Sequence, residues 1–203
     1  MSAADLPAAW RSVPRMSGRH AVLEPLQSTH ADGLRAAVEG SGLDALWYTS
    51  VPAAGRVDAY VRDVLDAQVA GRVLPFTVRD AAGAVVGTTR FYGLDPRVPR
   101  LLIGYTWYAP RVQRTGLNTE CKLMLLGHAF DTLGCASVGF ETSWFNFRSR
   151  AAIARLGARQ DGVLRNSARH ADGTLRDTVV FSILDTEWPA VRRNLQSRLD
   201  AHA

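Results

Sequence analysis

The chain has 203 residues, of which 47% are hydrophobic and 21% are charged, and its formal net charge is +5. This length and composition are typical of one folded domain with a sizeable core. No apolar run approaches the about 18 residues that a membrane-spanning helix needs. The basic residues are scattered along the chain, and all except Lys122 are arginines. This pattern disfavours nucleic acid as the main partner, and we expect the charge to act locally, on an anionic cofactor.

The first residues lack the apolar stretch of a signal peptide. We therefore expect residues 1–19 to form a loose arm and residues 20–203 to form a single domain. The cysteines, Cys121 and Cys135, lie near the two ends of an expected helix. At about 1.5 Å per residue they would be about 21 Å apart, which is beyond the reach of a disulfide. Free thiols indicate a reducing compartment, so we expect the protein to be cytoplasmic.

Hydrophobic periodicity and turn residues predict the secondary structure. In chain order the predicted elements are a strand over 21–26, helices over 28–38 and 56–70, strands over 73–79, 84–92 and 100–108, a helix over 118–133, a strand over 137–142, a helix over 146–156, strands over 158–169 and 174–184, and a terminal helix within 188–203. Ser28 is the expected N-cap of the first helix. This order predicts an α+β domain with one mixed sheet.

The turn over residues 109–116 leads directly into the predicted helix 118–133. A helix N-terminus carries unpaired backbone N–H groups and a partial positive charge, so it can bind a phosphate group. Gly116 lets the backbone approach such a ligand closely, and Arg111 and Arg114 add positive charge beside it. We interpret this turn as a pyrophosphate-binding site that uses neither a lysine nor a metal.

Four stretches, taken in order along the chain, resemble one protein family. They are Gln113-Arg-Thr-Gly-Leu-Asn118, Asn118-Thr-Glu-Cys-Lys122, Asn146-Phe-Arg-Ser149 with Leu156-Gly-Ala158, and the stretch 176–185 with Glu187-Trp188. In these motifs the chain resembles the GNAT (Gcn5-related N-acetyltransferase) family. It looks closest to the branch of RimJ and RimL, which are ribosomal-protein N-terminal acetyltransferases. The resemblance extends from about residue 22 to residue 188.

The resemblance implies a GNAT-like fold, with a mixed, mostly antiparallel sheet, flanking helices, and acetyl-CoA in a crevice at the splayed central strands. It implies an acyltransferase with acetyl-CoA as its cofactor. The cofactor-binding residues would be Gln113, Arg114, Thr115, Gly116, Leu117, Asn118 and Thr119 at the pyrophosphate, and Asn146 at the pantetheine arm. An asparagine side chain both donates and accepts hydrogen bonds, although Asn146 could also cap the helix that follows it.

The catalytic candidates are Ser149 and Glu141. Ser149 lies one helical turn after Asn146, where its hydroxyl could donate a hydrogen bond to the leaving thiolate. Glu141 could take the proton from the amine, whereas Glu120 is better explained as a favourable charge at a helix N-terminus. Many family members carry a tyrosine seven residues after the motif asparagine, but this chain has Ile153 there. The histidines are far apart in sequence, so we expect no metal site.

Aromatic residues supply candidates for the walls of an acceptor pocket, although each could instead belong to the core: Trp47, Tyr48, Tyr92, Tyr105 and Trp107. An α-amino group titrates near about 8 and a lysine near about 10.4. Because the chain offers no evident strong base, an α-amino acceptor suits it better. We expect the N-terminus of a protein or peptide, or an amino-acid-like small molecule.

Three alternatives remain open at this point. The acceptor could be a small amine such as a metabolite or an antibiotic. The protein could be a non-catalytic acyl-CoA-binding module, which the missing tyrosine would allow. Nucleic-acid binding is the least favoured of the three functions. The last hairpin, over 158–184, could also mediate a homodimer.

Overall fold

The structure is a computed structural model that describes residues 6–201. Its strands are β1 (Met16–Ser17), β2 (Ala21–Pro25), β3 (Val73–Asp80), β4 (Val85–Asp95), β5 (Arg100–Tyr108), β6 (Ser137–Ser143), β7 (Arg159–Arg169) and β8 (Leu175–Leu184). Its α-helices are α1 (Ala31–Val38), α2 (Val57–Val69), α3 (Leu117–Gly127), α4 (Phe147–Leu156) and α5 (Trp188–Asp200).

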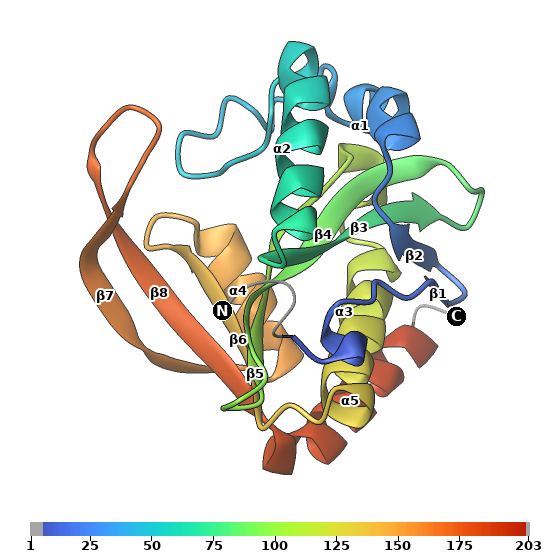
Figure 1. Ribbon diagram of the computed structural model, residues 1–203, viewed down its shortest axis with the longest axis vertical. Coiled ribbons are helices and arrows are strands. Elements are labelled where there is room, and N and C mark those ends of the chain that lie inside the picture. Colours follow the sequence, from blue (N-terminus) through green and yellow to red (C-terminus); the bar gives the residue numbers. More distant parts are fainter. Residues whose placement is uncertain (1–5, 202–203) are drawn as a thin grey trace.

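The strands form one eight-stranded sheet in the order β1-β2-β3-β4-β5-β6-β8-β7 (Figure 1). All neighbouring strands in this sheet are antiparallel except β5 and β6. The expected mixed, mostly antiparallel sheet with flanking helices is therefore confirmed.

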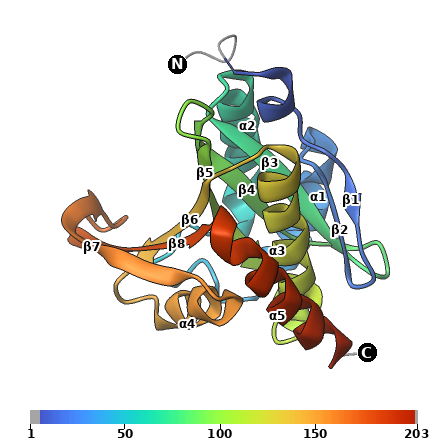
Figure 2. The same cartoon turned by 90° about the horizontal axis from the view of Figure 1, so that it is seen from below.

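Helices α1 and α2 cover one face of the sheet, and α3 and α5 cover the other (Figure 2). The alternation of side chains along β4 explains this arrangement. Phe91 points to the α3 face, where its ring lies 5.5 Å from that of Phe76 and 6.1 Å from that of His128. Arg90 points to the opposite face and donates a hydrogen bond to Tyr60 of α2. Each face of the sheet is thus buried under its own pair of helices.

The loose arm expected for residues 1–19 is wrong for the part that the structure describes. Leu6 and Trp10 belong to the hydrophobic core, with 4% and 5% of their surface exposed. Met16 and Ser17 form β1, which pairs with β2. Burying each of these two large apolar side chains stabilises the segment by about 2 kcal/mol or more. Residues 1–5 lie outside the described residues.

Two helix boundaries differ from the prediction. Ser28 is not an N-cap, because the chain makes a 3-10 turn over Ser28–His30 and this turn is capped by Gln27 and His30. The helix expected over 118–133 ends at Gly127, and a π-helical turn over His128–Thr132 follows it. Residues 202–203, at the end of the expected terminal helix, lie outside the described residues.

Strands β5 and β6 pair only where they begin. The pairing joins residues 100–102 of β5 to residues 137–139 of β6. Beyond this point β5 stays paired with β4 up to Tyr108, and β6 stays paired with β8 up to Ser143. The two strands therefore diverge, and the edge of β5 that faces β6 is left without a partner strand. A bulge in the β4–β5 pairing lies in the diverging part, where Tyr105 has a φ of 52°.

Candidate functional site

The backbone at the start of α3 presents a group of free hydrogen-bond donors. Within residues 6–201, the N–H groups of Arg114, Thr115, Gly116, Asn118 and Thr119 donate no hydrogen bond to the protein. The N–H of Leu117 alone in this stretch is paired, with the hydroxyl of Thr115 at 3.2 Å. Such a row of N–H groups at a helix N-terminus fits an anion.

The space beside Gly116, and not its backbone conformation, limits which side chains fit at this position. Its φ is −64°, which any residue adopts. A Cβ at this position would lie 2.9 Å from the imidazole ring of His20, which stands at the start of β2. His20 thus borders the donor row, although nothing in its sequence position indicated this role. A side chain at residue 116 would displace the ring and fill the space above the donors.

Several side chains of this turn are already engaged within the protein. Gln113 donates to the carbonyl of Tyr108 at 2.9 Å and accepts from Arg148 of α4 at 2.8 Å. Thr115 donates to the carbonyl of Val112 at 2.8 Å. The backbone of these two residues, more than their side chains, is therefore available to a ligand.

The two arginines of the turn have different roles. Arg111 was expected to add charge beside the ligand, but its guanidinium pairs with Asp80 at 2.5 Å. This ion pair links the turn to the end of β3, and Asp80 neutralises the charge of Arg111. Arg114 is exposed, and within the described part of the chain it has no ion-pair partner. Arg114 can therefore still contribute its charge to the site.

The first turn of α4 lies beside the same loop. The hydrogen bond from Arg148 to Gln113 brings the two segments together across 35 residues of sequence. Asn146 caps α4, and its side-chain oxygen accepts from the N–H of Ser149 at 3.0 Å. The amide nitrogen of Asn146 and the hydroxyl of Ser149 form no hydrogen bond among the described residues. Ile153 is buried in the core, so this position carries no proton donor.

Glu120 has a structural role. Its carboxylate accepts hydrogen bonds from the backbone N–H groups of Arg19, His20 and Ala21, at 2.8, 2.6 and 2.7 Å. The side chain is only 8% exposed. Glu120 thus joins α3 to the start of β2, and it does not face an acceptor.

The strand register brings a charged group from each half of the sheet to the same face. Arg90 pairs with Gly104, and Leu102 pairs with Gly139. Gly104 lies two residues after Leu102 on β5, and Glu141 lies two residues after Gly139 on β6. Because side chains two residues apart on a strand point to the same face, Arg90, Gly104 and Glu141 form one row on the α2 face. This row crosses the place where β5 and β6 diverge.

Tyr92 and Tyr105 lie beside this row. Their rings meet edge to face at 5.1 Å. The pKa of Tyr92 is raised, mainly by burial and also by the nearby charge of Glu141. The guanidinium of Arg90 lies 4.1 Å from the ring of Tyr105. Glu141 is exposed. The expected pocket residues Tyr92 and Tyr105 thus lie on the same face of the sheet as the expected catalytic residue Glu141.

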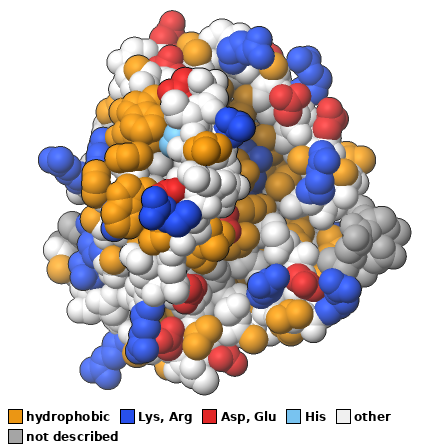
Figure 3. Space-filling model, turned by 90° about the vertical axis from the view of Figure 1, so that its left-hand side faces the viewer, with side chains coloured by type: hydrophobic (Ala, Val, Ile, Leu, Met, Phe, Trp, Pro, Cys, Tyr) orange, Lys and Arg blue, Asp and Glu red, His pale blue; other side chains and the backbone are white. Residues whose placement is uncertain are grey.

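Trp47 and Tyr48 form a second group. The ring of Trp47 lies 5.6 Å from Tyr48, 5.3 Å from Phe145 and 4.6 Å from His170. These contacts join the loop after α1 to the loop before α4 and to the tip of the β7–β8 hairpin. Figure 3 shows hydrophobic side chains gathered on this side of the molecule, with a histidine among them. Trp107, by contrast, belongs to the hydrophobic core and is 6% exposed.

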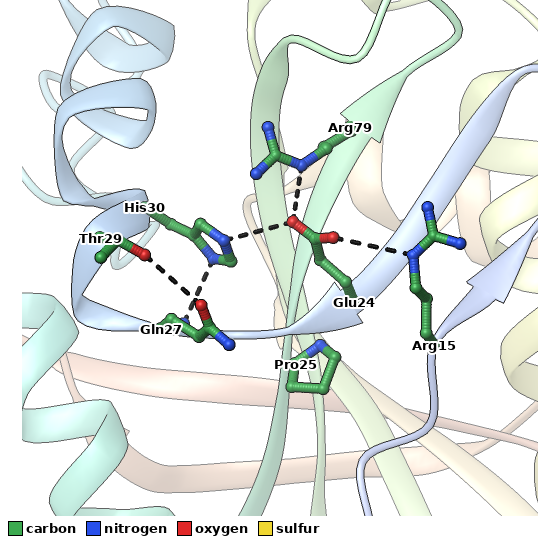
Figure 4. A pocket seen from close by; sticks show the side chains of 7 residues that line it. All are labelled: Arg15, Glu24, Pro25, Gln27, Thr29, His30 and Arg79. Atoms are coloured by element: carbon green, nitrogen blue, oxygen red, sulfur yellow. Dashed lines mark hydrogen bonds and ion pairs between the residues drawn. The ribbon is translucent and has the colours of Figure 1, made fainter.

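A cavity of about 500 Å³ lies elsewhere, on the β2–β3 side of the sheet. It is lined by Arg15, Glu24, Pro25, Gln27, Thr29, His30 and Arg79 (Figure 4). Glu24 already pairs with Arg79 at 2.6 Å and with His30 at 3.2 Å. Because its charged groups satisfy one another, we assign this cavity no ligand.

The cysteines do not take part in the site. Both thiols are free and buried, and burial raises the pKa of Cys121 and of Cys135 to about 12. Such thiols are poor nucleophiles. Among the described residues no group of His, Cys, Asp and Glu could hold a metal ion. None of the helices in this part of the chain is long and apolar enough to cross a membrane.

Comparison with known proteins identifies the family. The acetyltransferase (GNAT) domain family matches residues 20–159. The "Putative ribosomal N-acetyltransferase YdaF" of Bacillus subtilis is 29% identical over 106 residues, which cover 52% of this chain and 57% of that protein. The uncharacterized N-acetyltransferase YoaA of the same organism is 30% identical over 49% of this chain and 55% of its own. The chain therefore matches little more than half the length of these curated relatives.

Solved structures match over more of the chain. A GCN5-related N-acetyltransferase from Brucella melitensis is 30% identical, with a TM-score of 0.84 over 93% of this chain and 86% of that one. RimJ of Mycobacterium smegmatis, solved in complex with CoA-disulfide, has a TM-score of 0.76 over 94% of this chain and 96% of that one. RimJ is only 20% identical, so this likeness concerns the fold.

Proposed function

Since this chain belongs to the GNAT family of acetyltransferases, we propose that it transfers an acetyl group from acetyl-CoA to a primary amine. The acceptor we propose is the α-amino group of a protein or peptide N-terminus, or of an amino-acid-like small molecule. The observation that carries this proposal is the row of free N–H groups at the start of α3, beside the diverging strands β5 and β6.

The residues at this place fit the cofactor. A pyrophosphate is an anion that five unpaired backbone N–H groups and the exposed Arg114 can bind. Beyond Leu102 the unpaired edge of β5 offers backbone groups to the amides of the pantetheine arm. Asn146 has already committed its oxygen to the N–H of Ser149. Its side-chain N–H donors are unpaired among the described residues, and we assign them to a carbonyl of that arm.

When bound, acetyl-CoA supplies an acetyl group activated as a thioester. A backbone N–H within residues 104–107 would donate a hydrogen bond to the thioester carbonyl oxygen. The carboxylate of Glu141 accepts the proton that the acceptor amine releases. The hydroxyl of Ser149 would donate a hydrogen bond to the sulfur of the leaving CoA, because the buried Ile153 stands where many family members carry a tyrosine. The α-amino group of the acceptor suits this site because a weak base suffices for it.

The experiment that tests cofactor binding is isothermal titration with acetyl-CoA. In the Gly116→Glu variant a carboxylate would lie beside the donor row, so we expect the Kd to rise at least about 100-fold. Arg114→Glu, which changes an exposed side chain, is expected to raise the Kd about 10-fold. Gly55→Glu is the matched control, because a Cβ there meets nothing within 4 Å. Unaltered binding by Gly116→Glu, or no binding by the wild type, would contradict the proposal.

A second candidate function is binding of acyl-CoA without catalysis. Ile153 favours it, because the position is buried among apolar side chains and offers no hydroxyl. Release of CoA in the presence of a panel of α-amino acceptors separates the two functions. Tight binding without acetylation of any amine would establish the binding module. The free thiols agree with action in the cytoplasm, which we propose as its location.

A further inference from the structure

Arg90 is a buried positive charge without a negative partner. Its side chain is 7% exposed, and within the part of the chain that the structure describes it forms no ion pair. One nitrogen donates to the hydroxyl of Tyr60 at 2.9 Å. The guanidinium lies over the rings of Tyr105 and Tyr60, at 4.1 and 5.5 Å. An arginine has five N–H donors and keeps its charge in proteins, so most of its binding capacity is unused.

Arg176 provides a second, independent observation. Its Nε is enclosed by the protein and has no hydrogen-bond partner among the described residues. Arg176 lies four residues before Val180, which pairs with Glu141, so both charged residues are on the same face. Arg90 and Tyr92, two residues apart on β4, lie on this face as well, and the charges of both arginines act to lower the pKa of Tyr92. Two arginines with unused hydrogen-bond donors thus lie on the face of the sheet that carries Glu141.

Leaving a charge buried and unpaired is costly, and an ion pair formed with a ligand recovers part of that cost. The planar guanidinium matches a carboxylate in size and in the direction of its hydrogen bonds. Glu141 stands in the same row as Arg90, with Gly104 between them. Neighbouring strands are about 4.8 Å apart, so the two backbones are about 10 Å or more apart. The row therefore places a negative and a positive group on either side of Gly104, where a Cβ would lie 2.8 Å from the ring of Tyr92.

We infer that the acceptor carries a carboxylate close to its primary amine, and that Arg90, assisted by Arg176, binds this carboxylate while Glu141 faces the amine. This inference rests on the proposed acetyl transfer and narrows its acceptor. A free amino acid has both groups, and so does a peptide with an acidic residue at its N-terminal end. A phosphate dianion fits less well, because the negative charge of Glu141 lies on the same face.

The test compares acceptors that differ only in the carboxylate, by following CoA release. One arm uses free L-amino acids against their carboxamides. The other uses peptides that begin with Asp or Glu against the same peptides with Asn or Gln. We expect the wild type to prefer the carboxylate form at least about 10-fold in kcat/KM in one arm. The arm that shows the preference identifies the source of the carboxylate.

The Arg90→Met variant removes the charge at similar volume. We expect the KM for the carboxylate acceptor to rise about 100-fold, with little change in kcat or in the Kd for acetyl-CoA, and the preference over the amide to disappear. Arg193→Met, on the exposed side of α5, is the control. The preference of the wild type for the carboxylate acceptor over the amide is measured without any variant. Misfolding of Arg90→Met would therefore not prevent the test.

Two results would overturn the inference and leave the proposed function in place. The first is equal acetylation of acids and amides by the wild type, which would leave acetyl transfer intact while refuting the carboxylate. The second is an equal loss for both acceptors in a folded Arg90→Met variant. Acetylation of no acceptor at all, despite binding of acetyl-CoA, would instead refute the proposed function and this inference with it.

Discussion

Lys122 is the single lysine of the chain, and it is buried on α3. Its ammonium donates to the hydroxyl of Thr106 on β5 at 2.9 Å, and that hydroxyl lies 2.7 Å from the hydroxyl of Thr89. Burial lowers the pKa of Lys122 from 10.5 to about 8. A charged group at this place therefore destabilises the folded protein at neutral pH, and the nearby hydroxyls offset only part of the cost.

The Lys122→Met variant tests this balance. Between the folded pKa of about 8 and the unfolded value of 10.5, the unfolded chain binds more protons, so this group makes the free energy of unfolding rise with pH. We expect the wild type to gain up to about 3 kcal/mol relative to the variant across this interval. Urea denaturation of both proteins from pH 7 to pH 10 measures the difference. Parallel curves over that interval would contradict the lowered pKa.

Side chains that act locally were predictable, and those that act through distant partners were not. Asn146 precedes a helical pattern, and it indeed caps α4. Arg90 could not be identified as a site residue, because its place in the same row as Glu141 depends on the register of β4, β5 and β6. Trp107 appeared to be a possible pocket residue, but the sequence cannot show how far the core extends. The β-bulge at Tyr105 changes which side chains share a face, and no turn signal marks it.

At the level of elements, a carboxylate of α3 binds the backbone at the start of β2. Glu120 accepts three backbone N–H groups from residues 19–21, and a Cβ on Gly18 would lie 2.2 Å from its carboxyl carbon. The same residues carry His20 against Gly116. The position of the donor row relative to β2 is therefore fixed by this connection.

The Glu120→Gln variant should weaken this connection. The amide has one acceptor oxygen, and its N–H groups would face backbone donors, so about 2–4 kcal/mol of stability should be lost. Because the donor row would be less well positioned, we also expect weaker binding of acetyl-CoA. Thermal unfolding and titration with acetyl-CoA measure the two effects. Glu39→Gln, an exposed residue, should leave both unchanged, and an unaltered Tm for Glu120→Gln would argue against the connection.

The elements themselves could be predicted because most of them have a clear apolar period. The divergence of β5 and β6 could be anticipated only from family resemblance, because both strands have ordinary strand patterns. The π-helical turn after Gly127 was not predictable, since the apolar positions Phe130 and Leu133 continue the helical spacing.

At the scale of the whole molecule, the described N-terminal segment is part of the core. We expect Trp10→Ala to cost about 3–5 kcal/mol, because it removes a large side chain that is 5% exposed. Val69→Ala, at a position 81% exposed on α2, is the control and should cost less than about 0.5 kcal/mol. Denaturant midpoints measure both changes. A Trp10→Ala variant as stable as the wild type would support the loose arm after all.

The Glu120 connection also bears on how the protein is made. Its partners are about a hundred residues apart in sequence, so a ribosome must complete α3 before β2 can be anchored to it. Strand β6 likewise waits for β8, which emerges later. Contacts between such distant segments form slowly. The nascent chain must therefore expose the α3 face of β2 to β5 until α3 has been synthesised, and this is the period when it would most need a chaperone.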